Sequence, residues 1–469
     1  MKTALALELA LITALVFEPA VHTQSTRLVL MRPEVLSAGC PWPGCDPGPA
    51  RLVEIDVEGA RVVSVRSVPL ERGEAPLLAA TAEGRYLVWL GNDGAQRYPP
   101  MNLTVHDRVA GVTSVVLRQA TPGPYGREYR IVAHPTETRV FARLYYPPTI
   151  DASAVGARGL DVGGEFQTFH GITADGGVAL ISRDDVSVAC RVDTATGVIV
   201  GQITGRQFAR LWAISADGLH VYAHTYRYED FATFQILTRY DALTGLVLAE
   251  REYPIDPLDF EFVRRLDLDP HTGRLYVDIG GGRYRVLDPL SLERIGLVAT
   301  PLLPLPAQEP HAAVAVSGRL AFDPHRPRAF LLATRGMRAD TGDPGVSRID
   351  IVDTNTLALV EGADLGIQVG PTEIVVVPRP PAPTALTSAV SGSRVTLQWT
   401  PGARPGQAAA FRVEAGSQTG LSNLATMTTG VVSEFVVDGV PAGTYYVRVR
   451  ALNWGGSSEA SPEVVVTVQ

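Results

Sequence analysis

The sequence predicts an all-β protein, and three observations support this prediction. Turn–strand phrases recur along most of the chain, as in ISADGLHVYAH at 214–224, where a short polar turn precedes alternating residues. The 45 glycines and 35 prolines are dispersed, as expected for many short strands that are joined by turns. Beyond the first residues, no stretch of convincing length has the spacing of an amphipathic helix.

The composition of the 469-residue chain is that of a folded protein without excess positive charge. Hydrophobic residues make up 46% and charged residues 19%, which argues against a disordered chain. The net charge of −8 argues against binding to nucleic acid or to anionic lipid. The sole lysine is Lys2, so a chain cleaved beyond it has no lysine-dependent mechanism.

Residues 1–24 have the pattern of a secretory signal peptide. Lys2 precedes an apolar run from Ala4 to Phe17, and we place cleavage near residue 24, although Glu8 is atypical. A buried N-terminal helix is the alternative. No later segment has the roughly 18 uninterrupted apolar residues of a membrane helix. We therefore expect a secreted or periplasmic (cell-envelope) protein that has no membrane span.

Two of the three cysteines are close together in the sequence. Cys40 and Cys45 bracket the loop CPWPGC, and in an exported protein such a pair closes a small disulfide loop, with free thiols as the alternative. A zinc site would need more ligands nearby. Cys190 lies in the strand-like run VSVACRVD, and we expect it to be a buried apolar residue.

Two phrases alternate along residues 25–378. The first is a turn followed by a strand and occurs six times; the second is a strand, an Asp-led turn and a strand, and occurs seven times. One unit is therefore four strands, with an irregular period of roughly 30 to 65 residues, centred near the length of a propeller blade. Segments 26–31 and 372–378 would complete one unit from both ends, which removes unpaired sheet edges. We predict a ring of seven units, with six or eight as alternatives.

This repeat resembles the seven-bladed YVTN-type and WD-repeat-like β-propellers of bacterial exported proteins. The resemblance rests on DGLHVY at 217–222, on GRLYV at 273–277 and on the D-x-x-T-G turns at 193–197 and 241–245. It covers residues 25–378 and implies a fold. It does not imply one function, because such propellers include binding scaffolds and several unrelated enzymes.

A second β domain follows the proline-rich linker at 379–383. Within residues 384–469, SRVTLQW (393–399) and GTYYVRVRALNWGG (443–456) alternate as strands do. The pattern is similar to a fibronectin type III domain, an immunoglobulin-like β-sandwich. Trp399 matches its core tryptophan, and Tyr445 matches the tyrosine whose hydroxyl ties down a strand corner. The resemblance implies structural roles for both residues and a spacer or adhesion role for the domain.

The sequence contains no motif for catalysis, for a cofactor or for a metal, so we expect no catalytic, cofactor-binding or metal-binding residue. In a strand, His220 and His224 would lie roughly 13 Å apart, too far to share one ion. LDLDP (266–270) and RADTGDPG (338–345) carry spaced acids but lack the full ligand set of a calcium loop. Other acids and histidines recur at turn positions and are interpreted as structural: Asp193, Asp241, Asp288, Asp353, His134, His271 and His325.

Long insertions between the two phrases of a unit are the predicted binding loops, and one of them is TYRYEDFATF at 225–234. By strand order they lie on one face of the ring, and long loops on a rigid frame commonly carry binding residues. Tyrosine and arginine are enriched at interaction hot spots. The candidate partner-binding residues are Arg97, Tyr98, Tyr145, Tyr146, Tyr226, Arg227, Tyr228 and Arg338. Ordinary solvated loops are the alternative.

Two functions are consistent with this sequence. The first is an exported, non-catalytic binding scaffold, which we expect to be a monomer and whose loops engage a protein or carbohydrate partner. The alternative is a propeller-type hydrolase or lyase. That enzyme would require at least two ionisable groups, brought from different units into the central channel.

Overall fold

Every regular element that the structure describes is a β-strand, which confirms the all-β prediction. The computed structural model describes residues 27–35, 47–56, 61–67, 77–92, 101–118, 131–135, 137–142, 149–151, 167–183, 187–206, 209, 211–229, 232–254, 263–302, 316–324, 326–335, 346–365, 373–377, 379–402 and 408–469. The chain divides into two compact units, called here the ring unit (Ser25–Pro378 with Arg404–Gln407) and the C-terminal unit (Arg379–Ala403 and Ala408–Gln469, grouped with Met1–Gln24).

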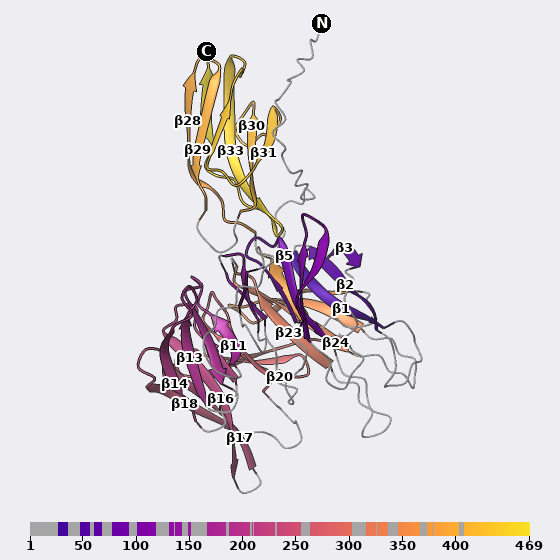
Figure 1. The fold of residues 1–469 in the computed structure, drawn as a ribbon, viewed down its shortest axis with the longest axis vertical. Helices are drawn as coiled ribbons and strands as arrows, with labels where there is room; N and C mark the ends of the chain where they lie inside the picture. Colours follow the sequence, from indigo (N-terminus) through magenta and orange to yellow (C-terminus); the bar gives the residue numbers. More distant parts are fainter. Residues whose placement is uncertain are drawn as a thin grey trace. The chain divides into compact units, whose positions relative to one another are not determined.

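The described part of the ring unit contains seven antiparallel sheets, which follow one another along the chain (Figure 1). The first sheet contains β27 (Glu373–Val377), β1 (Arg27–Val35), β2 (Pro47–Asp56) and β3 (Arg61–Ser67), the second contains β4 (Leu77–Ala80), β5 (Tyr86–Asn92), β6 (Met101–Asp107) and β7 (Val112–Arg118), and the third contains β8 (Ile131–Ala133), β9 (Arg139–Ala142) and β10 (Thr149–Asp151). The fourth sheet contains β11 (Gln167–Ile172), β12 (Val178–Arg183), β13 (Val188–Asp193) and β14 (Ile199–Thr204), and the fifth contains β15 (Leu211–Ile214), β16 (His220–Glu229), β17 (Ala232–Asp241) and β18 (Val247–Pro254). The sixth sheet contains β19 (Arg265–Leu268), β20 (Leu275–Gly280), β21 (Arg283–Leu287) and β22 (Arg294–Ala299), and the seventh contains β23 (Val316–Phe322), β24 (Arg328–Arg335), β25 (Val346–Asp353) and β26 (Leu359–Asp364).

The sheets form a closed, propeller-like ring. The innermost strands of neighbouring sheets contact each other in the order β23, β27, β4, β8, β11, β15 and β19, and β23 contacts β20 of the sheet that contains β19. These seven strands therefore surround a common centre. A closed ring leaves no terminal sheet exposed at its face, which removes a common route to aggregation.

The ring is closed by strands from both ends of its sequence. β27 pairs with β1 in an antiparallel register that runs from Val377 opposite Arg27 to Glu373 opposite Met31. β1 then pairs with β2, so the first and last segments of the ring lie in one four-stranded sheet. The predicted pairing of 26–31 with 372–378 is thus confirmed.

The Asp-led turns follow one hydrogen-bonding pattern. Between β17 and β18, Asp241 Oδ1 accepts hydrogen bonds from the N–H groups of Leu243 (3.0 Å) and Thr244 (2.8 Å). Gly245 then takes a φ of 72°, a left-handed conformation that glycine adopts without steric cost. The same carboxylate pattern occurs at Asp193, Asp288 and Asp353. The predicted structural role of these aspartates is confirmed.

Large aromatic side chains fill the space between sheets. Tyr222, on β16, is 2% exposed, and its hydroxyl donates a hydrogen bond of 3.1 Å to the carbonyl of Pro289 in the next sheet. Tyr276 is fully buried and packs edge-on against Phe322 of the following sheet at 5.1 Å between ring centroids. The aromatic residues therefore fix the spacing of neighbouring sheets.

The C-terminal unit is built from two antiparallel sheets that share one core. One sheet contains β28 (Thr384–Ser391), β29 (Arg394–Thr400) and β32 (Glu434–Val437). The other contains β31 (Ala425–Thr429), β30 (Ala410–Gly416), β33 (Gly443–Asn453) and β34 (Gly456–Ser457), with β35 (Val464–Val468) also paired to β33. Trp399 from the first sheet packs against Phe411 from the second, with ring centroids 5.4 Å apart. The Tyr445 hydroxyl donates a hydrogen bond of 2.8 Å to the Pro441 carbonyl.

The described segments include no helix that is long and apolar enough to span a bilayer.

Candidate functional site: the central cavity and a projecting hairpin

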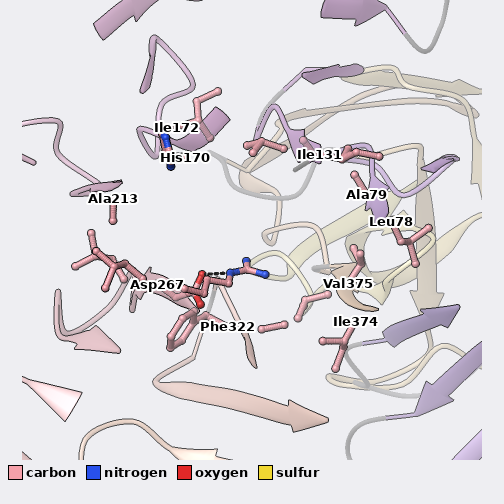
Figure 2. A pocket seen from close by; sticks show the side chains of 18 of the residues that line it. Leu78, Ala79, Ile131, His170, Ile172, Ala213, Asp267, Phe322, Ile374 and Val375 are labelled. Atoms are coloured by element: carbon pink, nitrogen blue, oxygen red, sulfur yellow. Dashed lines mark hydrogen bonds and ion pairs between the residues drawn. The ribbon is translucent and has the colours of Figure 1, made fainter. Parts of the chain in front are cut away.

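A cavity of about 420 Å³ lies at the centre of the ring and is lined by residues from the innermost strands of all seven sheets (Figure 2). Most of the residues that line it have apolar side chains, with Leu78, Ile131, Ile172, Ile214 and Ile374 contributed by different sheets. Pockets for small molecules have volumes of roughly 300–1,000 Å³ and combine apolar walls with a few polar groups. The cavity is therefore large enough to hold a small molecule.

His170 is the first polar group of this cavity, and a β-bulge positions it. In the pairing of β11 with β12, Phe169 faces Ile181 and Gly171 faces Leu180, so His170 is one extra residue in the register of β11. A bulge bends the strand and turns a side chain to a new direction. His170 lines the cavity (Figure 2) and is 7% exposed. Its Nε2 lies 2.7 Å from the Oγ of Ser182, on β12.

Arg265 and Asp267 supply the other charged groups of the lining. They are two residues apart on β19 and therefore lie on the same face of the strand. Arg265 Nε donates a hydrogen bond of 2.6 Å to Asp267 Oδ1, and the two side chains are 30% and 12% exposed. Figure 2 shows this ion pair beside Phe322. The pair is formally neutral and brings both a cation and an anion to the cavity.

A second carboxyl group lies in the wall next to this pair. Asp278, on β20, is directly opposite Arg265 in the strand register and is 2% exposed. Burial raises the pKa of Asp278, in spite of a hydrogen bond of 2.8 Å that its Oδ1 accepts from the N–H of Gly280. Arg319 Nη1 lies 4.0 Å from its other oxygen. The charged side of the cavity is thus the sheet that contains β19 and β20.

Sequence reasoning missed His170, Arg265 and Asp267 as a group. Asp267 lies in the LDLDP segment that was considered for calcium, but its neighbour Asp269 serves a turn, where it accepts hydrogen bonds from the N–H of His271 and from the Thr272 hydroxyl. Within the described residues, no group of three His, Cys, Asp or Glu could hold a metal ion. The enzyme hypothesis requires at least two ionisable groups from different units in the central channel. His170, on β11, and Arg265 and Asp267, on β19, meet this requirement.

The hairpin of β16 and β17 corrects one expectation. Residues 225–234 were expected to form a loop, but β16 continues to Glu229 and β17 begins at Ala232, with these two residues paired. The alternation that begins at His220 continues through Tyr226 and Tyr228, and each residue has a cross-strand partner, so the ribbon extends as sheet. The inner strand β15 reaches only to the level of His224, and the hairpin projects beyond it (Figure 1).

Three predicted binding residues lie on this hairpin. Tyr226 is partly buried: its hydroxyl accepts a hydrogen bond of 2.9 Å from the N–H of Val263, and its ring meets His224 edge-on at 4.6 Å. Tyr228 is 74% exposed, with its ring centroid 6.4 Å from that of Tyr226. Arg227 points to the other face, since alternate residues of a strand do so, and it forms an ion pair with Glu252.

The remaining predicted residues have different outcomes. Seven lie outside the described residues: Cys40, Cys45, Arg97, Tyr98, Tyr145, Tyr146 and Arg338. Cys190 is a buried free cysteine, as expected.

The turn histidines bridge sheets, which confirms their structural interpretation at two of three positions. His134 is 2% exposed and lies against the turn at Gly176 in the next sheet. His271 Nε2 lies 3.0 Å from the carbonyl oxygen of Asp323. His325 lies outside the described residues.

Comparisons with known proteins give structural likenesses only. No family model matches the chain, and no curated protein matches it. Among solved structures, dihydro-heme d1 dehydrogenase NirN in complex with DHE is similar over 75% of each chain, with 12% identity and a TM-score of 0.40. The FN5 domain of Drosophila Lar is similar over 19% of this chain and 96% of its own, with 22% identity and a TM-score of 0.17. The strand contacts of this chain, and not these likenesses, are the evidence for the propeller-like ring.

Proposed function

We propose that this chain is an exported, non-catalytic binding scaffold. In this proposal the ring unit is a seven-bladed β-propeller of the YVTN and WD-repeat-like type, and the C-terminal unit is a fibronectin type III domain that acts as a spacer or adhesion module. The seven sheets and the two-sheet C-terminal unit support this assignment. Residues 1–24 act as the signal peptide, and the protein functions outside the cytoplasm.

The observation that carries the binding role is the exposed tyrosine on a supported hairpin. Tyr228 is 74% exposed, whereas most large hydrophobic groups of the described ring are packed between sheets. Tyr226, beneath it, is anchored by its hydrogen bond to Val263. A rigid aromatic side chain loses little conformational entropy on binding, so tyrosine is enriched at interaction hot spots. We propose that Tyr228 contacts a protein or carbohydrate partner.

A binding comparison between two exposed residues tests this proposal. The variant Y228A should weaken capture of the partner by tenfold or more, which is about 1.4 kcal/mol. The control L243A removes a side chain that is 71% exposed in a turn at the other end of the same sheet, and it should leave capture unchanged. The assay is a pull-down and a glycan array with the purified full chain. Equal binding by both variants and the unaltered chain would remove the support for this proposal.

One observation favours an enzyme as the second candidate. A histidine within hydrogen-bond distance of a serine hydroxyl can act as the base that activates a nucleophile. His170, which lines the cavity, has this geometry with the buried Ser182 on β12. Arg265 would then stabilise a developing negative charge. A serine-reactive fluorophosphonate probe tests this directly, by intact mass of the unaltered chain against S182A. The absence of labelling in the unaltered chain would exclude a serine hydrolase at this site.

A further inference from the structure

One face of the C-terminal unit carries a square of charged residues. In the antiparallel register of β30 with β33, Arg412 lies directly opposite Arg450, and Glu414 lies directly opposite Arg448. Residues two apart on one strand share a face, as do directly opposite residues on neighbouring strands. The four side chains therefore lie together on one surface of this sheet.

A single carboxylate holds all three arginines of this square. Arg448 Nε donates a hydrogen bond of 2.7 Å to Glu414 Oε2, and Arg450 Nε donates one of 3.3 Å to the same oxygen. Arg412 Nε lies 3.2 Å from the other oxygen. Burial raises the pKa of Glu414, but Arg448, Arg450 and Arg412 outweigh burial and hold it below its ordinary value. Glu414 is thus ionised at neutral pH, and the square keeps two uncompensated positive charges.

This arrangement fixes the guanidinium groups, whose side chains are 17–20% exposed. Most of their terminal nitrogens make no hydrogen bond within the described part of the chain. Among the described residues, those nitrogens donate two hydrogen bonds, one of 3.4 Å from Arg412 to the Ser457 hydroxyl and one of 2.9 Å from Arg450 to the Ser458 carbonyl. Within the described part of the chain, both terminal nitrogens of Arg448 lack a hydrogen-bond partner. Because Glu414 already orders the three side chains, binding of an anion would cost little further entropy.

Two threonines extend the square on the neighbouring strand β31. Thr428 lies opposite Arg412, and Thr426 lies opposite Glu414, and both threonines are exposed. Adjacent strands are about 4.8 Å apart, so Thr428, Arg412 and Arg450 form one row across three strands. This row combines a hydroxyl group with two guanidinium groups and contains no carboxylate.

The charge of the square contrasts with that of the whole chain. Residues 379–469 contain six arginines and five acidic residues, whereas the complete chain carries a net charge of −8. Two uncompensated charges are too few for nucleic acid, whose binding depends on many phosphate contacts, and for a membrane surface, where clusters of about four to eight basic residues act. A chain with spaced carboxylate or sulfate groups and many hydroxyls matches this surface better, because arginine binds such oxyanions through paired hydrogen bonds.

We propose that the face formed by Arg412, Arg448, Arg450, Thr426 and Thr428 binds an acidic glycan through its carboxylate or sulfate groups. This site goes beyond the proposed function, in which the C-terminal unit serves only as a spacer or adhesion module. It shares no residue with the proposed Tyr228 site, so either site can fail without the other.

Calorimetric titration of the full chain with defined probes tests this site. The probes are a sulfated uronate hexasaccharide, an unsulfated polygalacturonate fragment, the neutral cellohexaose and vesicles of anionic phospholipid. We expect at least one acidic probe to bind, with an affinity that falls as salt increases, and cellohexaose to bind at least tenfold more weakly. The acidic probe that binds better identifies sulfate or carboxylate as the preferred group. Equal binding of cellohexaose would overturn the proposal, as would binding only to vesicles of anionic phospholipid.

Matched variants separate this site from general electrostatic attraction. R412Q and R450Q should each weaken acidic-probe binding by about tenfold, because each removes a charge-assisted hydrogen-bond donor. R394Q makes the same charge change at a side chain that is 60% exposed on the other sheet, next to Asp438, and should have no effect. Y228A should also have no effect. Thermal unfolding checks that each variant folds, and equal losses in R394Q and R412Q would overturn the proposal.

Discussion

The contact between His134 and the turn at Gly176 gives a direct test of how neighbouring sheets interlock. Gly176 has a φ of 77°, and a Cβ added there would lie 2.2 Å from Cε1 of His134. His134 is only 2% exposed, so its ring cannot move aside freely. Gly111 is a matched control, because it has a φ of 65° in a turn and nothing lies within 4 Å of an added Cβ. The left-handed backbone therefore destabilises both alanine variants, and the collision with His134 destabilises only G176A.

G176A and G111A should differ in how much they lower the free energy of unfolding. An alanine in the left-handed region costs roughly 1–2 kcal/mol, which should be the whole effect of G111A. Overpacking a filled site adds about 1–3 kcal/mol, so G176A should lower the free energy of unfolding by about 2–5 kcal/mol. Urea unfolding, followed by tryptophan fluorescence, measures both values. In G176A, the further change H134A should recover about 1–3 kcal/mol relative to the sum of the single changes. Equal destabilisation by G176A and G111A would refute this account of the sheet contact.

Three further predictions concern buried polar groups. Glu54 and Arg108 form an ion pair between neighbouring sheets, with side chains 6% and 1% exposed. E54A should therefore lower the free energy of unfolding in urea by about 3–5 kcal/mol. A loss no larger than that of variants at exposed sites would contradict this. Burial lowers the pKa of His224 from 6.5 to about 3, so the stability that its neutral form contributes is complete above pH 6.5. The free energy of unfolding should then fall by about 1.4 kcal/mol per pH unit between pH 6.5 and about 3. Unfolding measured as a function of pH should lack this slope in H224Q. Y445F removes the hydrogen bond to the Pro441 carbonyl and should lower the stability of the C-terminal unit by about 1 kcal/mol, and hydrogen exchange at this corner that matches the unaltered chain would contradict it.

The regular parts of the ring could be predicted because their signals are local. An Asp-led turn such as that at Asp241 satisfies its own backbone groups within four residues, so its sequence is sufficient to identify it. The pairing of β27 with β1 was predictable for a different reason. Each end of the repeat array lacks what the other supplies, and a closed ring removes both unpaired edges.

The cavity residues could not be predicted because their positions depend on register. His170 reaches the cavity through one extra residue in β11, and a bulge is a property of two paired strands that neither sequence shows alone. The prediction of a loop at residues 225–234 was wrong for a similar reason. Their polar and aromatic residues indicated a loop, but cross-strand partners on β17 extend the sheet to Glu229. Where pairing decides the structure, the sequence of one strand is insufficient.

The hydrogen bonds of the turns help to decide where a partner can bind. At Asp241, the carboxylate already accepts two backbone N–H groups and the hydroxyl of Thr244, so this group has little remaining capacity for a ligand. Asp193, Asp288 and Asp353 are occupied in the same way. A partner at this end of the ring would have to displace contacts that hold the turns together, at a cost in ring stability. We therefore expect a partner to bind side chains that the fold holds in place while their hydrogen-bond donors remain available. Arg448, which Glu414 orders, and Tyr228, which the β16–β17 hairpin supports, are such side chains.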